Sequence, residues 1–273
     1  MKVLLLTPPE PEPHESCTFQ EINSLLKQLG HAVVEHKADA ALFENVQVGK
    51  PDVVFNLASL TACEKTNFIP AVLEIAGVRY TGSGFLSLSL ACNATRLFPL
   101  LYQSGIPMPP FWITKVGDID QRARRTYPLD LFLAGSRQKL TLRDARELGI
   151  AVQAFPSQKA VVLQQHLAGD VISLYLLDTI SFLSAGSAAC LPFADQIRQL
   201  IEARGLVRFD FILAGEPFLV GLDVSPDPLG DEFLALAAQS GWSAMDVVRT
   251  VLEHAATDRQ PSSQLLETTI PGV

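Results

Sequence analysis

The chain has 273 residues, of which 48% are hydrophobic and 18% charged, with a formal net charge of -8. This length and composition predict a large buried core and exclude a disordered chain. The acidic balance, without a long basic run, argues against binding to nucleic acid or to a membrane surface. The apolar run Val3 to Leu6 is too short for a signal peptide or membrane span, and the four cysteines show no Cys-x-x-Cys spacing. A cytoplasmic protein with free thiols is therefore expected.

The first third of the chain alternates between strand and helix patterns. Apolar runs predict strands at 2–7, 32–38, 51–58 and 78–84, and helical periodicity predicts helices at 18–31 and 67–77. Strands that alternate with helices form parallel sheets covered on both faces. A doubly wound α/β domain is therefore predicted over residues 1–92.

The rest of the chain is mixed. Residues 84–105 predict a helical stretch that ends at Gly105, 106–114 an extended connection rich in proline, and 113–165 a small irregular α/β segment. Residues 93–165 are thus expected to form a linker helix and a reduced central subdomain, and 166–257 a C-terminal α+β subdomain. Ser243 and Asp246 are a predicted capping pair for the last helix. The tail 258–273 is expected to be flexible.

The most informative stretch is a predicted hairpin at residues 207–226, "VRFDFILAGEPFLVGLDVSP". If the turn centres the pairing, Leu213 opposes Phe218, Asp210 opposes Gly221, and Arg208 opposes Asp223. Side-chain alternation then places two carboxylates and a guanidinium on one face. Two interpretations stay open at this point. The group holds magnesium and a phosphate, since hard cations take oxygen ligands, or Arg208 and Asp223 form a cross-strand ion pair.

Four segments in order, "VVFNLA", "IPAVLEIAGVRYTGSGFLSLSLAC", "SGIPMPPFWI" and "VRFDFIL…PFLVGLDVSP", resemble the D-alanine:D-alanine ligase branch of the ATP-grasp enzymes. The resemblance implies an ATP-grasp fold, in which an N-terminal α/β domain precedes two subdomains that grip ATP between them. It also implies a reaction in which a carboxylate is phosphorylated and an amine displaces the phosphate, with magnesium and cationic side chains stabilising the transferred group.

The resemblance assigns roles to several positions. Arg208 matches the family's catalytic arginine, Asp210 its first metal-binding aspartate, and Asp223 replaces its metal-binding asparagine. In the nucleotide site, Gln164 stands where the family has an adenine-binding acid, and Leu167 at an apolar position that contacts adenine. Asp170 lies beside Val171, which replaces the ribose-binding glutamate.

Other expected groups are missing. The bridging metal ligand falls on Gly221, and the two lysines that contact ATP fall on Ala94 and Phe132. No glycine-rich phosphate loop follows Phe132, and the long closing loop is reduced to residues 179–194. Since loss of one donor aimed at transition-state charge costs roughly 2.7 to 4 kcal/mol, these changes predict weak or no ligase activity.

Three functional hypotheses follow. The first is a degenerate ATP-grasp protein that acts as a binding or partner subunit, paired with itself or with an active homologue through its N-terminal domain, as the resemblance implies. The second is a divergent ligase for an amino acid or peptide, using Arg208, Asp210 and Asp223; ATP and magnesium are expected cofactors only in that case. The third is a sensor of a small, amino-acid-like ligand.

Overall fold

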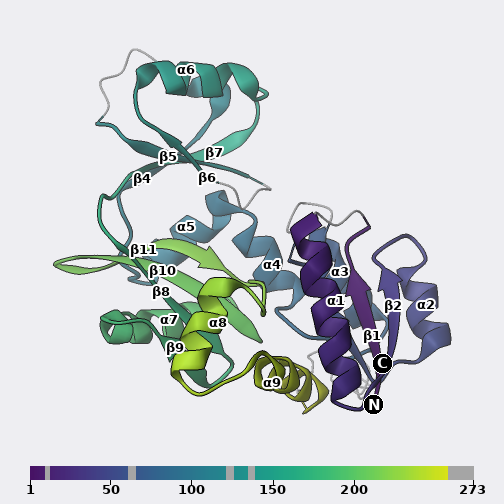
Figure 1. The fold of residues 1–273 in the computed structure, drawn as a ribbon. Helices are drawn as coiled ribbons and strands as arrows, with labels where there is room; N and C mark the ends of the chain where they lie inside the picture. The colour runs from purple at the N-terminus through teal and green to yellow at the C-terminus, as the bar shows by residue number, and fades with distance from the viewer. Residues whose placement is uncertain (10–12, 61–65, 121–125, 135–138, 258–273) are drawn as a thin grey trace, which may run out of the picture.

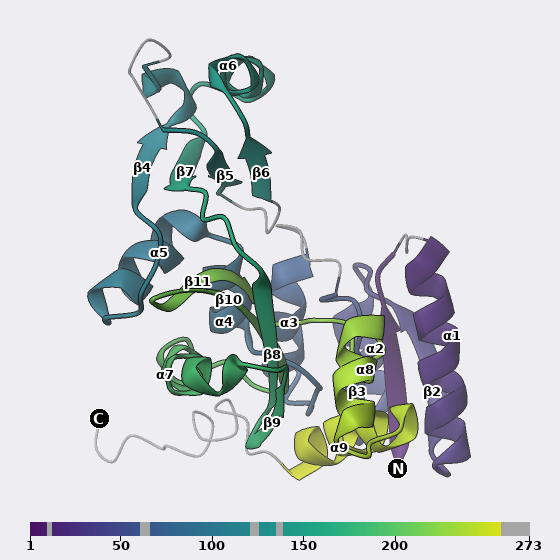
Figure 2. The same cartoon turned by 60° about the vertical axis from the view of Figure 1, so that its left-hand side comes forward.

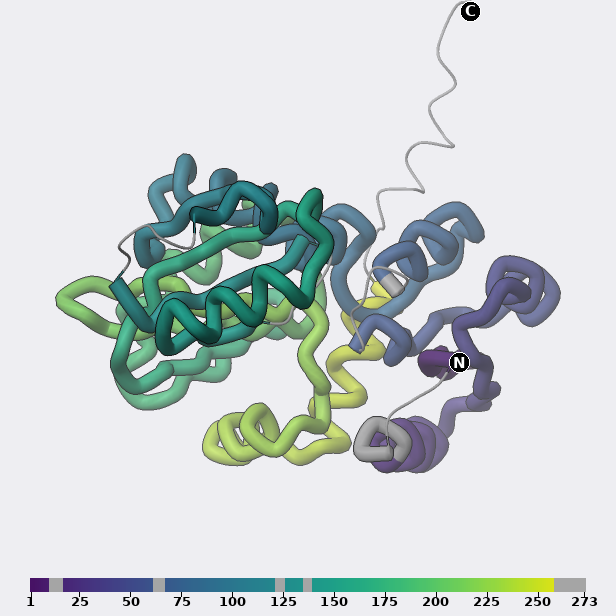
Figure 3. Tube along the Cα trace, turned by 90° about the horizontal axis from the view of Figure 1, so that it is seen from above, coloured from purple at the N-terminus to yellow at the C-terminus, as the bar shows by residue number. Residues whose placement is uncertain are grey.

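The computed structural model describes residues 1–9, 13–60, 66–120, 126–134 and 139–257, and these residues form three sheets (Figure 1). A three-stranded sheet lies in the N-terminal part, and two four-stranded sheets follow it in the chain. Seen from above, the second sheet in the chain lies over the third, and the N-terminal sheet lies to one side (Figure 3). The ATP-grasp prediction of three successive α/β units agrees with this arrangement.

The N-terminal sheet is parallel, in the order β2-β1-β3. Its strands are β1 (Lys2–Thr7), β2 (Ala32–Lys37) and β3 (Val53–Asn56). Helices α1 (Pro13–Gln28) and α9 (Ala244–Thr257) pack on one face, and α2 (Leu42–Gly49) and α3 (Ile69–Ile75) on the other. Successive side chains of a strand point to opposite faces of the sheet. Because helices cover both faces here, β1 and β3 carry apolar side chains on both sides. The predicted doubly wound domain is confirmed, although the strand expected at 78–84 is only a bridge between Val54 and Tyr80.

The helical stretch expected at 84–105 is confirmed, and it consists of two helices: α4 (Phe85–Ala91) and α5 (Ala94–Gln103). Asn93 separates them, with φ -128° and ψ 79°, outside the helical region. Its side-chain oxygen accepts a hydrogen bond from the hydroxyl of Thr95 at 2.7 Å. Asn93 makes no side-chain capping hydrogen bond to the backbone of α5, and its non-helical backbone separates the two helices.

The central sheet is antiparallel in the order β4-β7-β5-β6, a more regular structure than the sequence suggested. Its strands are β4 (Phe111–Lys115), β5 (Leu129–Leu133), β6 (Lys139–Leu142) and β7 (Ala160–Gln165), with the short helix η2 (Val116–Asp118) after β4. Leu131, Leu142 and Leu163 pack with residues of α6 (Ala145–Ala154). Because side chains alternate, Asp130, Phe132 and Gln164 share the opposite face, toward the third sheet.

The C-terminal sheet is also antiparallel, in the order β11-β10-β8-β9. Its strands are β8 (Val171–Leu177), β9 (Ile180–Leu183), β10 (Leu206–Ala214) and β11 (Glu216–Asp223). The accompanying helices are η3 (Ser187–Cys190), α7 (Leu191–Leu200) and α8 (Asp231–Gln239). In Figure 2, α8 and α9 lie between this sheet and the N-terminal domain, and α9 contacts α1. The short helix η1 (Thr66–Phe68) precedes α3.

The predicted hairpin forms, with one correction to its register. Arg208 opposes Asp223 and Asp210 opposes Gly221, as expected, but Leu213 opposes Pro217 instead of Phe218. The turn is tighter than the sequence suggested, since Gly215 takes φ +87° between Ala214 and Glu216. A bulge beyond Asp210 absorbs the extra residue and restores the predicted pairing at the functional end.

At the start of α9, the predicted capping pair is confirmed. The Ser243 hydroxyl donates to Asp246 at 2.6 Å, and the Asp246 backbone N–H donates to the Ser243 oxygen at 3.2 Å. Among the described helices, none combines the length and apolar composition needed to span a bilayer. The tail predicted to be flexible lies outside the described residues.

Candidate functional site

A cavity of about 170 Å³ lies between the central and C-terminal sheets, and we call it the cleft. Residues of α5, β5, β6, β7, β10 and β11 line it. Its walls are mostly apolar, and Lys139, Gln164 and Asp210 are the hydrogen-bonding side chains among its described lining residues. Apolar pockets with a few convergent polar groups are the usual form of small-molecule sites, although most have roughly 300 to 1,000 Å³.

The positions where the resemblance expects two ATP-binding lysines, Ala94 and Phe132, both line the cleft. The Phe132 ring packs edge to face against Phe98, with ring centroids 5.0 Å apart. Phe98 makes a second edge contact with Phe111, at 5.5 Å. An aromatic cluster therefore occupies the wall where a cation was expected, and such a wall favours apolar groups over phosphate.

Lys139 lies in this wall and was not singled out from the sequence. It is the first residue of β6 and pairs directly with Phe132 across the two strands. Its ammonium group lies 3.5 Å from a carboxylate oxygen of Asp130, and 37% of its side chain is exposed. Lys139 could have been found from the sequence only by predicting that β5 and β6 pair as a hairpin. The irregular segment predicted at 113–165 did not include that hairpin.

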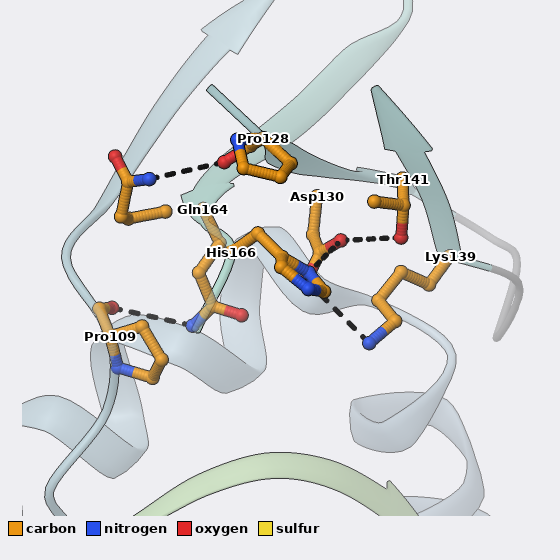
Figure 4. Close-up of polar contacts among 8 residues, drawn as sticks. Pro109, Pro128, Asp130, Lys139, Thr141, Gln164 and His166 are labelled. Carbon is orange, nitrogen blue, oxygen red and sulfur yellow. Dashed lines mark hydrogen bonds and ion pairs between the residues drawn. The ribbon is translucent and has the colours of Figure 1, made fainter. Parts of the chain in front are cut away.

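Asp130 is the centre of a polar cluster on the cleft-facing side of the central sheet (Figure 4). It is buried, and it accepts a hydrogen bond from the hydroxyl of Thr141 at 2.7 Å. Nδ1 of His166 lies 3.1 Å from both of its carboxylate oxygens. A buried carboxylate needs such hydrogen-bonding or charged partners. Because Lys139 lies beside Asp130, its positive charge is partly neutralised and is less available to a bound anion.

The three predicted nucleotide-binding residues occupy different positions. Gln164 is buried, lines the cleft, and donates from Nε2 to the carbonyl oxygen of Pro109 at 3.3 Å (Figure 4). Leu167 is half-buried and Asp170 exposed, in the connection from β7 to β8. Only Gln164 of the three is among the described residues that line the cleft.

Arg208, the predicted catalytic residue, is held by carboxylates. Its Nε lies 2.8 Å from Asp210 and its Nη1 lies 2.9 Å from Glu232 of α8, a residue not anticipated from the sequence. Its guanidinium also lies over the ring of Tyr175, 5.8 Å from the centroid. Burial lowers the pKa of Arg208, but the hydrogen bond and charge of Asp210, with Tyr175 and Glu232, raise that pKa above its ordinary value.

Asp210, a predicted metal ligand, is engaged on two sides and fills a neighbouring space. It accepts from Ser173 Oγ at 2.8 Å as well as from Arg208. A Cβ atom at Gly221 would stand 2.7 Å from its Oδ2. The Asp210 side chain therefore occupies the room that any side chain at position 221 would need.

Asp223, the second predicted metal ligand, is half-buried and accepts the backbone N–H of Ser225 at 2.9 Å. Within the described part of the chain, no group of three or more histidine, cysteine, aspartate or glutamate side chains is arranged to hold a metal ion. Metal binding by Asp210 and Asp223 stays a prediction. The described lining of the cleft thus combines apolar walls with a cation, Lys139, that lies beside the carboxylate of Asp130.

Comparison with known proteins finds D-alanine--D-alanine ligases among those similar to this chain. No family model matches the chain. It is 23% identical to a D-alanine--D-alanine ligase from Moorella thermoacetica, over 86% of this chain and 92% of that protein. It is 27% identical to a ligase of the same name from Syntrophotalea carbinolica, over 59% of this chain and 54% of that protein's length.

Solved structures give the same result. The fold matches a D-alanine--D-alanine ligase from Bacillus anthracis, complexed with ATP, at a TM-score of 0.78 and 14% identity, covering 93% of this chain and 97% of that one. The ligase from Coxiella burnetii matches at 0.75 and 13% identity, over 97% and 98%. The chain is similar in sequence to D-alanine--D-alanine ligases and has the fold of these solved ligases, the ATP-grasp fold that the sequence motifs indicated.

Proposed function

We propose that this protein is a degenerate member of the D-alanine:D-alanine ligase-like group that acts by binding and not by ligation. One observation carries the proposal. Ala94, Phe132 and Gly221 stand in the cleft at the positions where the resemblance expects two ATP-binding lysines and a bridging metal ligand. The relative from Bacillus anthracis was solved with ATP; among the described residues that line this cleft, the two expected lysines and the expected bridging ligand are replaced.

The electrostatics of the cleft support the proposal. Lys139, the cation among the described lining residues, lies beside Asp130; Arg208, which contacts the lining residue Asp210, lies between Asp210 and Glu232. A polyanionic nucleotide would have to displace these carboxylates in a chain of net charge -8. Because each missing stabiliser of transition-state charge costs roughly 2.7 to 4 kcal/mol, the described residues do not fit efficient phosphoryl transfer, even allowing for non-additive losses.

Calorimetric titration with ATP and magnesium tests the proposal directly. We expect no binding in the micromolar range, because the described cleft provides no cation free of a carboxylate partner. The control is Asp210→Asn, which removes a predicted metal ligand and should leave the null result unchanged. Micromolar binding of magnesium ATP by the wild type that is lost in Asp210→Asn would refute the proposal.

A divergent ATP- and magnesium-dependent carboxylate–amine ligase is the second candidate, and Lys139 favours it. This ammonium group lines the cleft directly across the strands from Phe132, so it could replace the expected phosphate lysine. Phosphate release from ATP in the presence of amino acids or small peptides would support this function. Lys139→Met should abolish that release, whereas Lys115→Met, an exposed lysine on β4, should not.

The proposed binding role has two alternatives: a protein partner or a small-molecule ligand. The outer helices of the N-terminal domain expose Val48 and Ile75, at 78% and 76%, together with Phe68 at 59%. Exposed apolar side chains in one region support pairing with a protein partner. The apolar cleft, with Lys139 and Asp210 as opposite charges, instead supports a sensor of a small amino-acid-like ligand. A thermal-shift screen of amino acids separates the forms, because a ligand of the native state raises its melting temperature.

A further inference from the structure

The guanidinium group of Arg208 is engaged by protein groups at each of its three nitrogen atoms. Nε lies 2.8 Å from Asp210 Oδ1, Nη2 donates to Ser173 Oγ at 3.3 Å, and Nη1 lies 2.9 Å from Glu232 Oε2. Its central carbon lies 5.8 Å from the ring centroid of Tyr175, so the ring covers one face. Arg208 and Asp210 are two residues apart on β10 and share a side of the sheet, and Asp210 lines the cleft. The arginine therefore stands beside the cleft with each nitrogen engaged.

The three polar partners of Arg208 differ in their accessibility. Asp210 and Ser173 oppose each other on paired strands of the C-terminal sheet, and the Ser173 hydroxyl donates to Asp210 at 2.8 Å. Glu232 instead reaches the guanidinium from the first turn of α8, and 50% of its side chain is exposed. The Arg208 side chain is itself 31% exposed. Glu232 is thus the partner that competes with dissolved anions for this arginine.

Helix α8 positions Glu232 beside the arginine. The next residue, Phe233, is buried, and its ring packs against those of Tyr175 and Phe182, with centroids 5.0 Å and 5.1 Å apart. This aromatic packing fixes the first turn of α8 against the C-terminal sheet. A carboxylate is also stabilised in the first turn of a helix by the positive end of the helix dipole. The fold therefore places the Glu232 carboxylate next to the guanidinium before any ligand arrives.

Tyr175 provides a second donor to Glu232. Burial raises the pKa of Tyr175, the nearby Arg208 lowers it, and the charges of Glu232 and Asp210 raise it, so that it lies above its ordinary value. The phenol therefore stays protonated, and it donates a hydrogen bond to Glu232. Nη1 of Arg208 and the phenol thus bind one carboxylate together. Charge-assisted donors of this kind also bind carboxylates and phosphates of ligands.

We propose that the Glu232 carboxylate occupies an oxyanion position beside the cleft and determines its specificity, because it keeps the carboxylate or phosphate of a ligand away from Arg208. This inference rests on the proposed function, since it assigns to one residue part of the discrimination against nucleotides. Removal of Glu232 would release Nη1 and the phenol of Tyr175 together, and a dissolved oxyanion could then bind to both. Asp210 and Ser173 would still hold the guanidinium in place.

Titrations of the full chain with acetate and with inorganic phosphate test the proposal, followed by calorimetry and thermal melting. Sodium chloride of matched ionic strength serves as the blank. We expect the wild type to show no binding beyond the blank, and Glu232→Ala to bind at least one anion about tenfold or more tightly, because it gains charged hydrogen bonds. Binding of acetate alone means that the position accepts a planar carboxylate, and binding of phosphate means that it accepts a tetrahedral anion; either result supports the proposal.

Asp231→Ala is the matched control. Asp231 precedes Glu232 in the first turn of α8 and is exposed, so its substitution makes the same change in net charge and at the helix terminus. It should leave anion binding as in the wild type, because the described contacts of Arg208 do not include Asp231. If Glu232→Ala does not fold, Glu232→Ser replaces it, since serine is also uncharged and too short to reach the guanidinium.

A double variant locates the gained binding. Tyr175→Phe keeps the aromatic packing but removes one of the two released donors, so adding it to Glu232→Ala should reduce the gain. The proposal is overturned if the Glu232 variant binds neither anion more tightly than Asp231→Ala, if the wild type binds as tightly as that variant, or if Tyr175→Phe leaves the gain unchanged. Each of these results is distinct from failure of the proposed function, which micromolar binding of magnesium ATP by the wild type would reveal.

Discussion

Gly221 leaves space that the Asp210 side chain occupies. The resemblance expects a bridging carboxylate there, but Asp210 fills the space, held by Arg208 and Ser173. Gly221→Ala would place Cβ 2.7 Å from Asp210 Oδ2 and 3.0 Å from its Cβ. Because Asp210 would have to leave two hydrogen bonds, we expect a loss of about 1 to 3 kcal/mol in the free energy of unfolding, measured by urea denaturation.

The matched control is Gly49→Ala, at the end of α2. A Cβ there meets only Pro51 Cδ, at 4.0 Å, and the φ angle is not in the left-handed region. Alanine is also the better helix former, so stability should not fall. If Gly221→Ala were as stable as Gly49→Ala, the packing of Asp210 against position 221 would be wrong.

Asp246 gives a second prediction at the residue scale. Hydrogen bonds from the side chain and backbone of Ser243, with the nearby Arg249, lower the pKa of this carboxyl from its ordinary 3.8. A depressed pKa in the folded state means that the ionised group adds stability above pH 3.8, and that this stability is lost as pH falls through the folded pKa. Asp246→Asn should therefore be less stable than wild type at neutral pH, and the difference should shrink in acid.

Melting curves at pH 7 and pH 3 measure this effect. Ser243→Ala provides the control, because it removes the first cause of the shift: substituting Asp246 in that background should produce a much smaller pH-dependent difference. A difference between wild type and Asp246→Asn that grows in acid would contradict the assignment.

Residues close in sequence were the most predictable. Ser243 and Asp246 lie three apart, and the pairing of Arg208 with Asp223 follows from strand alternation. Glu232 and Lys139 were missed because they reach the site from other elements, through contacts that no local pattern encodes. Asp130 lies within an apolar run of the sequence, and only the sheet places it beside His166.

At the scale of elements, the outer helices of the N-terminal domain carry the strongest evidence for a protein partner. Val48 of α2 and Ile75 of α3 are exposed at 78% and 76%, and the two helices contact each other. We expect the partner to be a second copy of this chain, since two-fold dimers are the commonest assemblies and bury one patch against itself. Wild type should then sediment as a dimer in analytical ultracentrifugation.

Val48→Glu and Ile75→Glu should each shift that dimer toward monomer, because a carboxylate buried in an interface would lose its hydration. Ile150→Glu is the matched control: Ile150 lies on α6 of the central subdomain and is 59% exposed, so its substitution should leave the dimer intact. A wild-type chain that sediments as a monomer at micromolar concentration would eliminate the homodimer.

On the scale of the whole molecule, the sequence predicted the order of the sheets better than the way in which they share their cores. One hydrophobic cluster joins β1, β3 and α1 to α8, α9, β8 and β9. The chain thus returns after more than 200 residues to cover the first sheet. Periodicity could identify α9 as amphipathic, but not which sheet its apolar face would meet. The central sheet has a separate cluster, formed by Val116, Ile119, Leu131, Leu142, Leu148, Ala151, Val161 and Leu163.

This division predicts how the protein unfolds. Leu252 of α9 is fully buried in the shared cluster, so Leu252→Ala should lose about 2 to 5 kcal/mol. The two tryptophans report on different parts of the molecule. Trp242 packs edge to face on Phe182 beside the shared cluster, with ring centroids 5.3 Å apart, whereas Trp112 lies on β4 of the central sheet. In single-tryptophan variants, Leu252→Ala should lower the melting temperature reported by Trp242 more than that reported by Trp112. Leu213→Ala, at an exposed hairpin position, should move neither by much. Equal shifts for both probes would show that the central subdomain unfolds together with the rest, and that its separate core gives it no independence.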